Sequence, residues 1–126
     1  RFFKEQNNEI KIIAAAPHPD DLVQGLRSLE EGYVPPIFDS SVLDGQIVVD
    51  SETSFATTKK LMNEFGIFSG ISCGAVVRAA AMLAERIDSG NIVLILADGG
   101  WKYLSTQLWT KDYSEIKENV KDVLWW

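Results

Sequence analysis

The sequence lacks the residues that build disulfides and metal sites, because it contains one cysteine, Cys73, and one histidine, His18. A single cysteine cannot form an internal disulfide, and one cysteine with one histidine provides no spacing of metal ligands. The adjacent Asp20 and Asp21 are more typical of a solvated turn than of a metal site. We therefore expect no metal, and we expect Cys73 to be a small buried residue rather than a nucleophile.

Two further absences exclude classes of partner. No apolar run reaches the roughly 20 residues that a membrane-spanning helix needs, so we expect no membrane segment. There are 12 basic residues against 18 acidic ones, the net charge is −6, and no basic stripe is visible, which disfavours a nucleic-acid partner. Together with the lone cysteine, these absences favour a cytoplasmic protein.

The sequence does have the composition of one folded domain. It has 126 residues, of which 46% are hydrophobic and 24% are charged, as is ordinary for a globular protein. Strands are expected at 11–16, 46–50 and 91–97, and helices at 51–65, 73–87 and 113–123, with 91–97 as the strongest strand. The order strand, strand, helix, helix, strand predicts an α/β fold in which at least part of the sheet is parallel.

The two central helices have recognisable ends. Asp50 or Ser51 is placed to cap the first of them, and Gly66 is expected to end it. The second helix, 73–87, is apolar nearly all the way round, which predicts a buried helix. Ser72 precedes that helix and is expected to be its N-cap, so that its hydroxyl would satisfy free N–H groups of the helix.

Two loops, 69–74 and 98–106, are candidate ligand sites, because α/β proteins bind ligands beyond the C-terminal ends of strands and at the N-terminal ends of helices. Ser72 is open to a second interpretation there, since the small residues around it would let a planar ligand approach and meet its hydroxyl through a ring nitrogen. Arg27 also has two interpretations, an anion clamp for a carboxylate or phosphate and an ordinary surface arginine.

The N-terminal end of the chain suggests that it is part of a longer protein. It opens on Arg1 rather than on Met, and Phe2 and Phe3 follow in what looks like the end of a helix. Two phenylalanines at a free terminus would expose apolar area that an intact protein covers, so we expect a fragment. At the other end, Trp125 and Trp126 are expected either to cover a cleft or to form a disordered or dimer-packed tail.

Four segments together resemble the C-terminal part of cysteine synthase. They are Glu64-Phe-Gly-Ile-Phe-Ser-Gly-Ile-Ser-Cys-Gly-Ala75, Asn91-Ile-Val-Leu-Ile-Leu-Ala-Asp-Gly-Gly100, Trp101-Lys-Tyr-Leu-Ser-Thr106 and Gln24-Gly-Leu-Arg-Ser-Leu-Glu-Glu-Gly-Tyr-Val-Pro35. Arg27 and the Trp101-Lys102 pair are similar to the B-type branch of these O-acetylserine sulfhydrylases. The resemblance implies that residues 1–126 are a C-terminal fragment of an enzyme that depends on pyridoxal phosphate (PLP). Its architecture would be the three-layer, sheet-and-helix α/β fold of tryptophan synthase β, fold type II.

The resemblance also implies a function and two site residues. Enzymes of this family form L-cysteine from O-acetylserine or O-phosphoserine and a sulfur donor, and a homodimer is expected. Ser72 matches the family position whose hydroxyl meets the pyridine nitrogen of PLP. A neutral hydroxyl there, unlike a carboxylate, does not hold the ring protonated. Arg27 lies where the B-type branch presents an arginine to the leaving group of the substrate.

The catalytic parts of the family are missing from this sequence. The family's Schiff-base lysine lies in an Asn-Pro-x-x-x-x-Lys context, and none of the prolines, Pro17, Pro19, Pro35 and Pro36, follows an asparagine. The glycine-rich phosphate loop and the Thr-Ser-Gly-Asn-Thr substrate loop are also absent. We therefore expect no catalytic residue in this chain, a partner in the missing N-terminal part of the same enzyme, and an inactive isolated chain without covalently bound PLP.

Three alternatives stay open. Cystathionine β-synthase and threonine dehydratase share the fold, although Tyr103-Leu-Ser-Thr106 after a glycine pair favours cysteine synthase over both. The third alternative is a non-catalytic α/β binding module whose matches to the family are accidental. Addition of PLP and the matching N-terminal part would distinguish a binding module, because it would recover neither colour nor activity.

Overall fold

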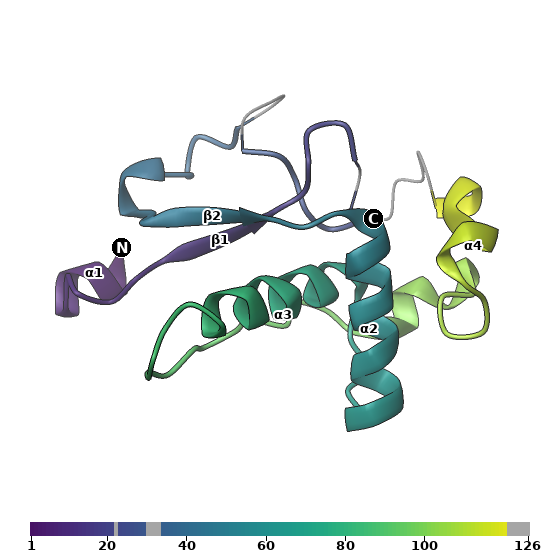
Figure 1. Cartoon of the computed structure of the whole chain (residues 1–126). Coiled ribbons are helices and arrows are strands. Elements are labelled where there is room, and N and C mark those ends of the chain that lie inside the picture. Colours follow the sequence, from purple (N-terminus) through teal and green to yellow (C-terminus); the bar gives the residue numbers. More distant parts are fainter. Residues whose placement is uncertain (22, 30–33, 121–126) are drawn as a thin grey trace.

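The computed structural model describes residues 1–21, 23–29 and 34–120, and it is a mixed helical and stranded structure (Figure 1). Its elements, in chain order, are helix α1 (Phe2–Gln6), strand β1 (Ile13–Ala16), a 3₁₀ helix (Ser40–Val42), strand β2 (Gly45–Val48), helices α2 (Ser51–Phe65) and α3 (Ile71–Ala84), a second 3₁₀ helix (Gly100–Thr106) and helix α4 (Tyr113–Val120). The predicted α/β class is confirmed.

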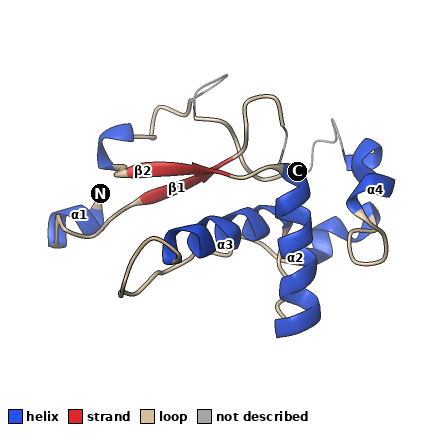
Figure 2. Ribbon diagram, viewed as in Figure 1, coloured by secondary structure: helices blue, strands red, loops and turns tan. Residues whose placement is uncertain are grey.

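The two strands form a parallel pair, as the element order predicts. Ile13 lies opposite Gly45 and Ala16 lies opposite Val48. Short apolar runs favour such strands, because parallel pairs are normally covered by helices. Figure 2 shows the two strands side by side, with α3 below them in this view, and α3 contacts β1.

The expected strand at 91–97 is wrong for the described chain. These residues form no strand, and the described sheet contains only β1 and β2. The side chains of Val93 and Ile95 are 88% and 78% exposed. A strand is defined by hydrogen bonds to a neighbouring strand, so apolar, β-forming residues cannot form one without a partner.

Helix α2 has the ends that its sequence predicts. Asp50 is the N-cap, and its two carboxylate oxygens accept hydrogen bonds from the N–H of Thr53 at 2.7 Å and from the Thr53 hydroxyl at 2.8 Å. Gly66 ends the helix with a φ of 68°, and its N–H donates to the carbonyl of Met62 at 3.0 Å. That left-handed conformation favours glycine, which explains why the helix stops there.

The expectation that Asp21 lies in a solvated turn is wrong, whereas it fits Asp20, whose side chain is 93% exposed. Asp21 is half-buried and accepts hydrogen bonds from the hydroxyl of Ser51 and, at 2.6 Å, from its N–H. Ser51 is the first residue of α2, so Asp21 adds a second carboxylate at the positive end of that helix. The loop after β1 is thereby fixed to α2.

Helices α2 and α3 pack closely because small residues lie between them. A Cβ added at Gly74 would overlap the carbonyl oxygen of Ser54 and the hydroxyl of Thr58. The Ser54 hydroxyl donates to the carbonyl of Ile71 at 2.7 Å, inside the contact. The core around the pair includes the fully buried side chains of Val23, Phe55, Ile71, Leu108 and Ile116.

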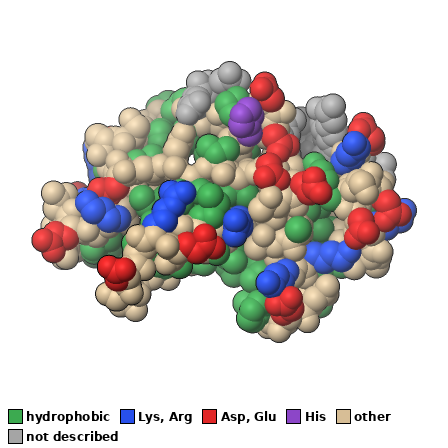
Figure 3. Space-filling view, in the orientation of Figure 1, with side chains coloured by type: hydrophobic (Ala, Val, Ile, Leu, Met, Phe, Trp, Pro, Cys, Tyr) green, Lys and Arg blue, Asp and Glu red, His purple; other side chains and the backbone are tan. Residues whose placement is uncertain are grey.

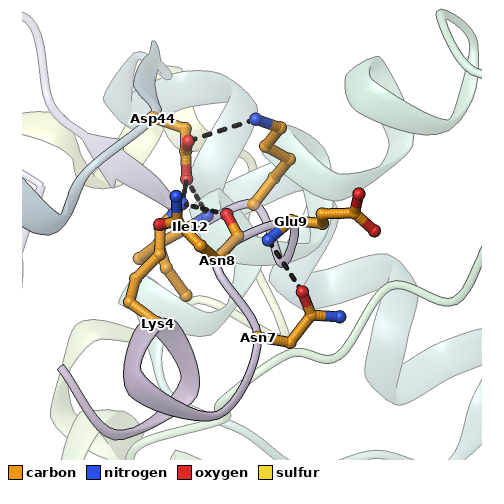
Figure 4. A network of polar contacts seen from close by, with 7 residues as sticks. Lys4, Asn7, Asn8, Glu9, Ile12 and Asp44 are labelled. Atoms are coloured by element: carbon orange, nitrogen blue, oxygen red, sulfur yellow. Dashed lines mark hydrogen bonds and ion pairs between the residues drawn. The ribbon is translucent and has the colours of Figure 1, made fainter.

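The N-terminal helix is fixed by charge rather than by burial, since Phe2 and Phe3 are 66% and 57% exposed. Asp44, just before β2, forms an ion pair with Lys4 at 2.7 Å and accepts a hydrogen bond from the N–H of Ile12 at 2.8 Å (Figure 4). The hydrogen bond from Lys4 is the main cause that lowers the pKa of Asp44 to about 2. One carboxylate therefore joins α1, the start of β1 and the start of β2.

Acidic and basic side chains are interspersed with hydrophobic ones on the face drawn in Figure 3. Within residues 1–21, 23–29 and 34–120, no helix is both long and apolar enough to cross a membrane. The same residues contain no group of three or more potential metal ligands. The C-terminal tail with Trp125 and Trp126 lies outside the described residues.

Candidate functional site

Three segments meet at the N-terminal end of α3: the loop 23–29, residues 70–73, and the turn that starts at Asp98. The approach depends on Gly25, whose φ of +87° favours glycine. A Cβ at Gly25 would lie 3.1 Å from the Cβ and Oγ of Ser72 and 3.7 Å from the phenol oxygen of Tyr103. The backbone of the loop therefore reaches Ser72 and Tyr103 because it carries no side chain there.

The prediction that Ser72 caps α3 is wrong. The helix begins at Ile71 and its N-cap is Gly70, so Ser72 lies inside the first turn. A Cβ at Gly70 would overlap the carboxylate of Asp98, which explains the glycine. Ser72 is 6% exposed, and no hydrogen bond joins its hydroxyl to the described residues. Unlike the Ser69 hydroxyl, however, the Ser72 hydroxyl is not a fully buried group without a partner, so solvent still reaches it.

Asp98 and Tyr103 form a buried pair beside this hydroxyl, and sequence reasoning missed it. The Tyr103 phenol donates to Asp98 Oδ2 at 2.7 Å, and Lys102 Nζ lies 3.7 Å from the same oxygen. Burial and the hydrogen bond to Asp98 raise the pKa of Tyr103 well above its usual value, so the phenol stays protonated and donates. The sequence feature that could have predicted this pair is the position of both residues in the candidate loop 98–106. Their spacing follows no helical or strand period, so the sequence did not indicate that they meet.

Cys73 is a buried residue, as expected, with 1% of its surface exposed. Its Sγ lies 3.7 Å from the carbonyl oxygen of Asp98 and 3.9 Å from Asp98 Oδ1. The thiol thus fills the space between α3 and the turn at Asp98.

Arg27 lies two residues after Gly25, on the loop that contacts Ser72. Its side chain is exposed and borders a groove that runs from Gly25 to Ser40 and is partly lined by Pro35, Pro36 and Ile37. One loop therefore contains Arg27, which borders the groove, and Gly25, which contacts Ser72 of α3; Ser72 itself does not line the groove.

Gly25 lets the backbone of the loop pack closely on the start of α3, since a Cβ there would lie only 3.1 Å from Ser72. Beside Ser72, Gly70 and Asp98 fix the first turn of α3 through a hydrogen bond of 3.1 Å from the Gly70 N–H to the Asp98 carbonyl.

Comparison with known proteins identifies relatives of the chain, although no protein-family model matches it. Cysteine synthase B of Pseudomonas aeruginosa is 31% identical over 106 residues, which are 84% of this chain and 36% of that protein. Cysteine synthase of Aquifex aeolicus is 35% identical over 115 residues, 87% of this chain and 35% of that protein. An O-ureido-L-serine synthase of Streptomyces lavendulae is 36% identical over 108 residues, 79% of this chain and 33% of that protein.

Solved structures show the same likeness. Cysteine synthase of Entamoeba histolytica matches with a TM-score of 0.77 and 27% identity over 86% of this chain and 35% of that one. An O-acetylserine-dependent cystathionine β-synthase of Helicobacter pylori matches with a TM-score of 0.72 and 30% identity over 83% of this chain and 37% of that one. The fold is thus that of the fold type II PLP enzymes.

Within that class, the chain is a homologue of the cysteine synthases and matches their C-terminal part. It spans about a third of the length of the curated relatives it matches.

Proposed function

We propose that this chain is the C-terminal part of a cysteine synthase, which forms L-cysteine from an activated serine and a sulfur donor by a PLP-dependent β-replacement. The observation that carries the proposal is the Ser72 hydroxyl, which lies in the first turn of α3 against Gly25 and is not a fully buried group without a partner, so solvent still reaches it. The Schiff-base lysine and the phosphate loop would belong to the N-terminal part of the same enzyme, and the active form would be a cytoplasmic homodimer.

In this proposal Ser72 holds the cofactor ring through its nitrogen. PLP supplies the electron sink that weakens bonds at the α-carbon of the amino-acid substrate. A neutral hydroxyl accepts or donates a hydrogen bond but carries no charge, so it does not hold a proton on the ring nitrogen as a carboxylate would. Ser72 would therefore keep the ring a mild electron sink, which suits β-elimination and replacement.

Arg27 would bind the leaving group of the substrate. Its exposed side chain borders the open groove, where a small amino acid has access. A planar guanidinium matches two phosphate oxygens better than it matches an acetyl ester. We therefore propose Arg27 as the residue that favours O-phosphoserine over O-acetylserine.

A second candidate is a cystathionine β-synthase that uses O-acetylserine. The likeness to the Helicobacter pylori enzyme of that description supports it, because its TM-score is close to that of the cysteine synthase match. The two functions share the activated serine and differ in the sulfur nucleophile, which is sulfide in one case and a thiol amino acid in the other. Product analysis with each nucleophile separates them.

The experiment combines the purified chain with the matching N-terminal part and PLP. We expect the mixture to develop the visible absorbance of bound cofactor and to release cysteine from an activated serine and sulfide, whereas the chain alone does neither. In the same mixture, Ser72→Ala should weaken cofactor binding about 3- to 10-fold, the effect of one buried hydrogen bond. A complete mixture that binds no PLP, or a chain that makes cysteine alone, would refute the proposal.

A further inference from the structure

Asp98 and Tyr103 lie directly behind the Ser72 site and are not explained by packing alone. The Asp98 side chain is 16% exposed and Tyr103 is 3% exposed, so a charged group and a phenol are both held away from water. Such a pair is costly to bury unless its hydrogen bond is satisfied, and here it is, at 2.7 Å.

The pair holds the first turn of α3 from one side. The Asp98 carbonyl accepts the Gly70 N–H at 3.1 Å, and the Asp98 carboxylate fills the space that a Gly70 Cβ would occupy. Gly70 is the N-cap, two residues before Ser72. The position of Ser72 along the turn therefore depends on where Asp98 lies.

The same pair borders the site from the other side. The Tyr103 phenol oxygen and the Ser72 side chain both lie within 3.7 Å of the Cβ position at Gly25. The phenol proton, however, is directed to Asp98 Oδ2, and Lys102 Nζ lies 3.7 Å from that oxygen. The Asp98 carboxylate thus already accepts a hydrogen bond and lies beside a cation. A ligand at this site would therefore meet the neutral hydroxyl of Ser72 rather than that carboxylate.

We infer that Asp98 and Tyr103 are positioning residues for cofactor recognition: they hold Ser72 against the ring nitrogen and keep the carboxylate engaged, so that the ring meets a neutral donor. This inference rests on the proposed function. Neither residue needs to touch the ring, since the pair acts through Gly70 and Ser72.

A double-mutant cycle tests the inference in the complete enzyme, with cofactor affinity and the absorbance spectrum of bound cofactor as readouts. Tyr103→Phe should weaken cofactor binding about 3- to 10-fold and change the spectrum, because it removes the donor to Asp98. In a Ser72→Ala background, the same substitution should add less than about 2-fold, since its effect passes through Ser72. Asp98→Asn, whose amide oxygen still accepts the phenol proton, should retain more affinity than Tyr103→Phe.

Tyr113→Phe is the matched control, because it also removes a half-buried phenol hydroxyl, but one whose ring lies against Phe55 and which is not part of the Asp98–Tyr103 pair. It should leave affinity and spectrum unchanged. Two outcomes would overturn the inference while the proposed function stands: Tyr103→Phe without effect, or with its full effect in the Ser72→Ala background. If Ser72→Ala alone changes neither readout, the role proposed for Ser72 is wrong, and the inference is wrong with it.

Discussion

The helix pair α2–α3 and the segment 91–97 are both rich in apolar residues, yet they differ in how many of their backbone hydrogen bonds and apolar contacts the described chain provides. The helices make their own backbone hydrogen bonds. Gly74 allows their close approach, and the Ser54 hydroxyl of α2 donates a hydrogen bond to the Ile71 carbonyl of α3. The segment 91–97 has no described strand beside it and exposes Val93 and Ile95. A helix completes its hydrogen bonds locally, whereas a strand depends on a neighbour, and the described part of the chain has none beside residues 91–97.

The largest expected effect comes from a break in the helix contact. Gly74→Ala places a methyl group against the Ser54 carbonyl and the Thr58 hydroxyl, so it should lower the free energy of unfolding by about 1–3 kcal/mol. Gly45→Ala is the control, because among the described residues a Cβ there meets only Ile13 Cδ1, at the ordinary contact distance of 3.6 Å. Thermal unfolding followed by circular dichroism measures both, and equal stability of the two variants would show that the helix contact adapts.

The next effect concerns the start of α2 and depends on pH. Burial acts to raise the pKa of Asp50, but hydrogen bonds from Thr53 outweigh it and the net pKa is lowered. The stabilisation is therefore present above the ordinary value of 3.8 and is lost as the pH falls through the lower value in the folded state. Asp50→Ala should cost about 1 kcal/mol at neutral pH, and Asp50→Asn should retain most of the cap. Denaturant unfolding at several pH values checks this, since the difference between wild type and Asp50→Asn should shrink in acid.

A smaller effect separates two buried serines of the helix pair. Ser54→Ala removes a hydroxyl that donates to the Ile71 carbonyl at 2.7 Å, so it should cost about 1 kcal/mol. Ser72→Ala removes a hydroxyl without a described partner, so it should change stability by less than about 0.5 kcal/mol in the 126-residue chain. If urea unfolding gave comparable losses of unfolding free energy for Ser54→Ala and Ser72→Ala, the Ser72 hydroxyl would have a structural role in this chain.

The smallest expected effect on stability concerns the exposed segment 91–97, which contrasts with the helix pair α2–α3. Val93→Thr with Ile95→Thr should change the stability of this chain by less than about 0.5 kcal/mol, because both side chains are exposed. The same double variant should assemble less well with the N-terminal part, as measured by the recovery of bound cofactor. A large loss of stability in the chain alone would mean that the segment already has a partner.

Local features were predictable from the sequence, and most features that need distant contacts were not. The ends of α2 at Asp50 and Gly66 follow from short-range chemistry. Element order predicted a sheet that is parallel at least in part, and the pairing of β1 with β2 agrees. The cap of α3 was assigned to Ser72 and not to Gly70, because only the carboxylate of Asp98, 28 residues further on, shows why a glycine is needed there.

The candidate site follows the same rule. Ser72 and Arg27 were identified by resemblance, and in the structure Gly25, on the loop that carries Arg27, contacts Ser72 of α3. The Asp98–Tyr103 pair was not predicted, since its two residues meet only when the turn at Gly99 and Gly100 folds back on α3. The prediction of a strand at 91–97 was wrong although the residues themselves favour a strand. A strand also needs a neighbouring strand, and none is present beside 91–97 among the described residues.

The exposed segment also bears on the colloidal behaviour of the chain. Residues 92–96 are Ile-Val-Leu-Ile-Leu, an uncharged, proline-free run of the kind that stacks into intermolecular cross-β structure when its backbone is unpaired. The net charge of −6 opposes such contact through repulsion between molecules. Salt screens that repulsion, so self-association of the chain should rise with ionic strength and protein concentration.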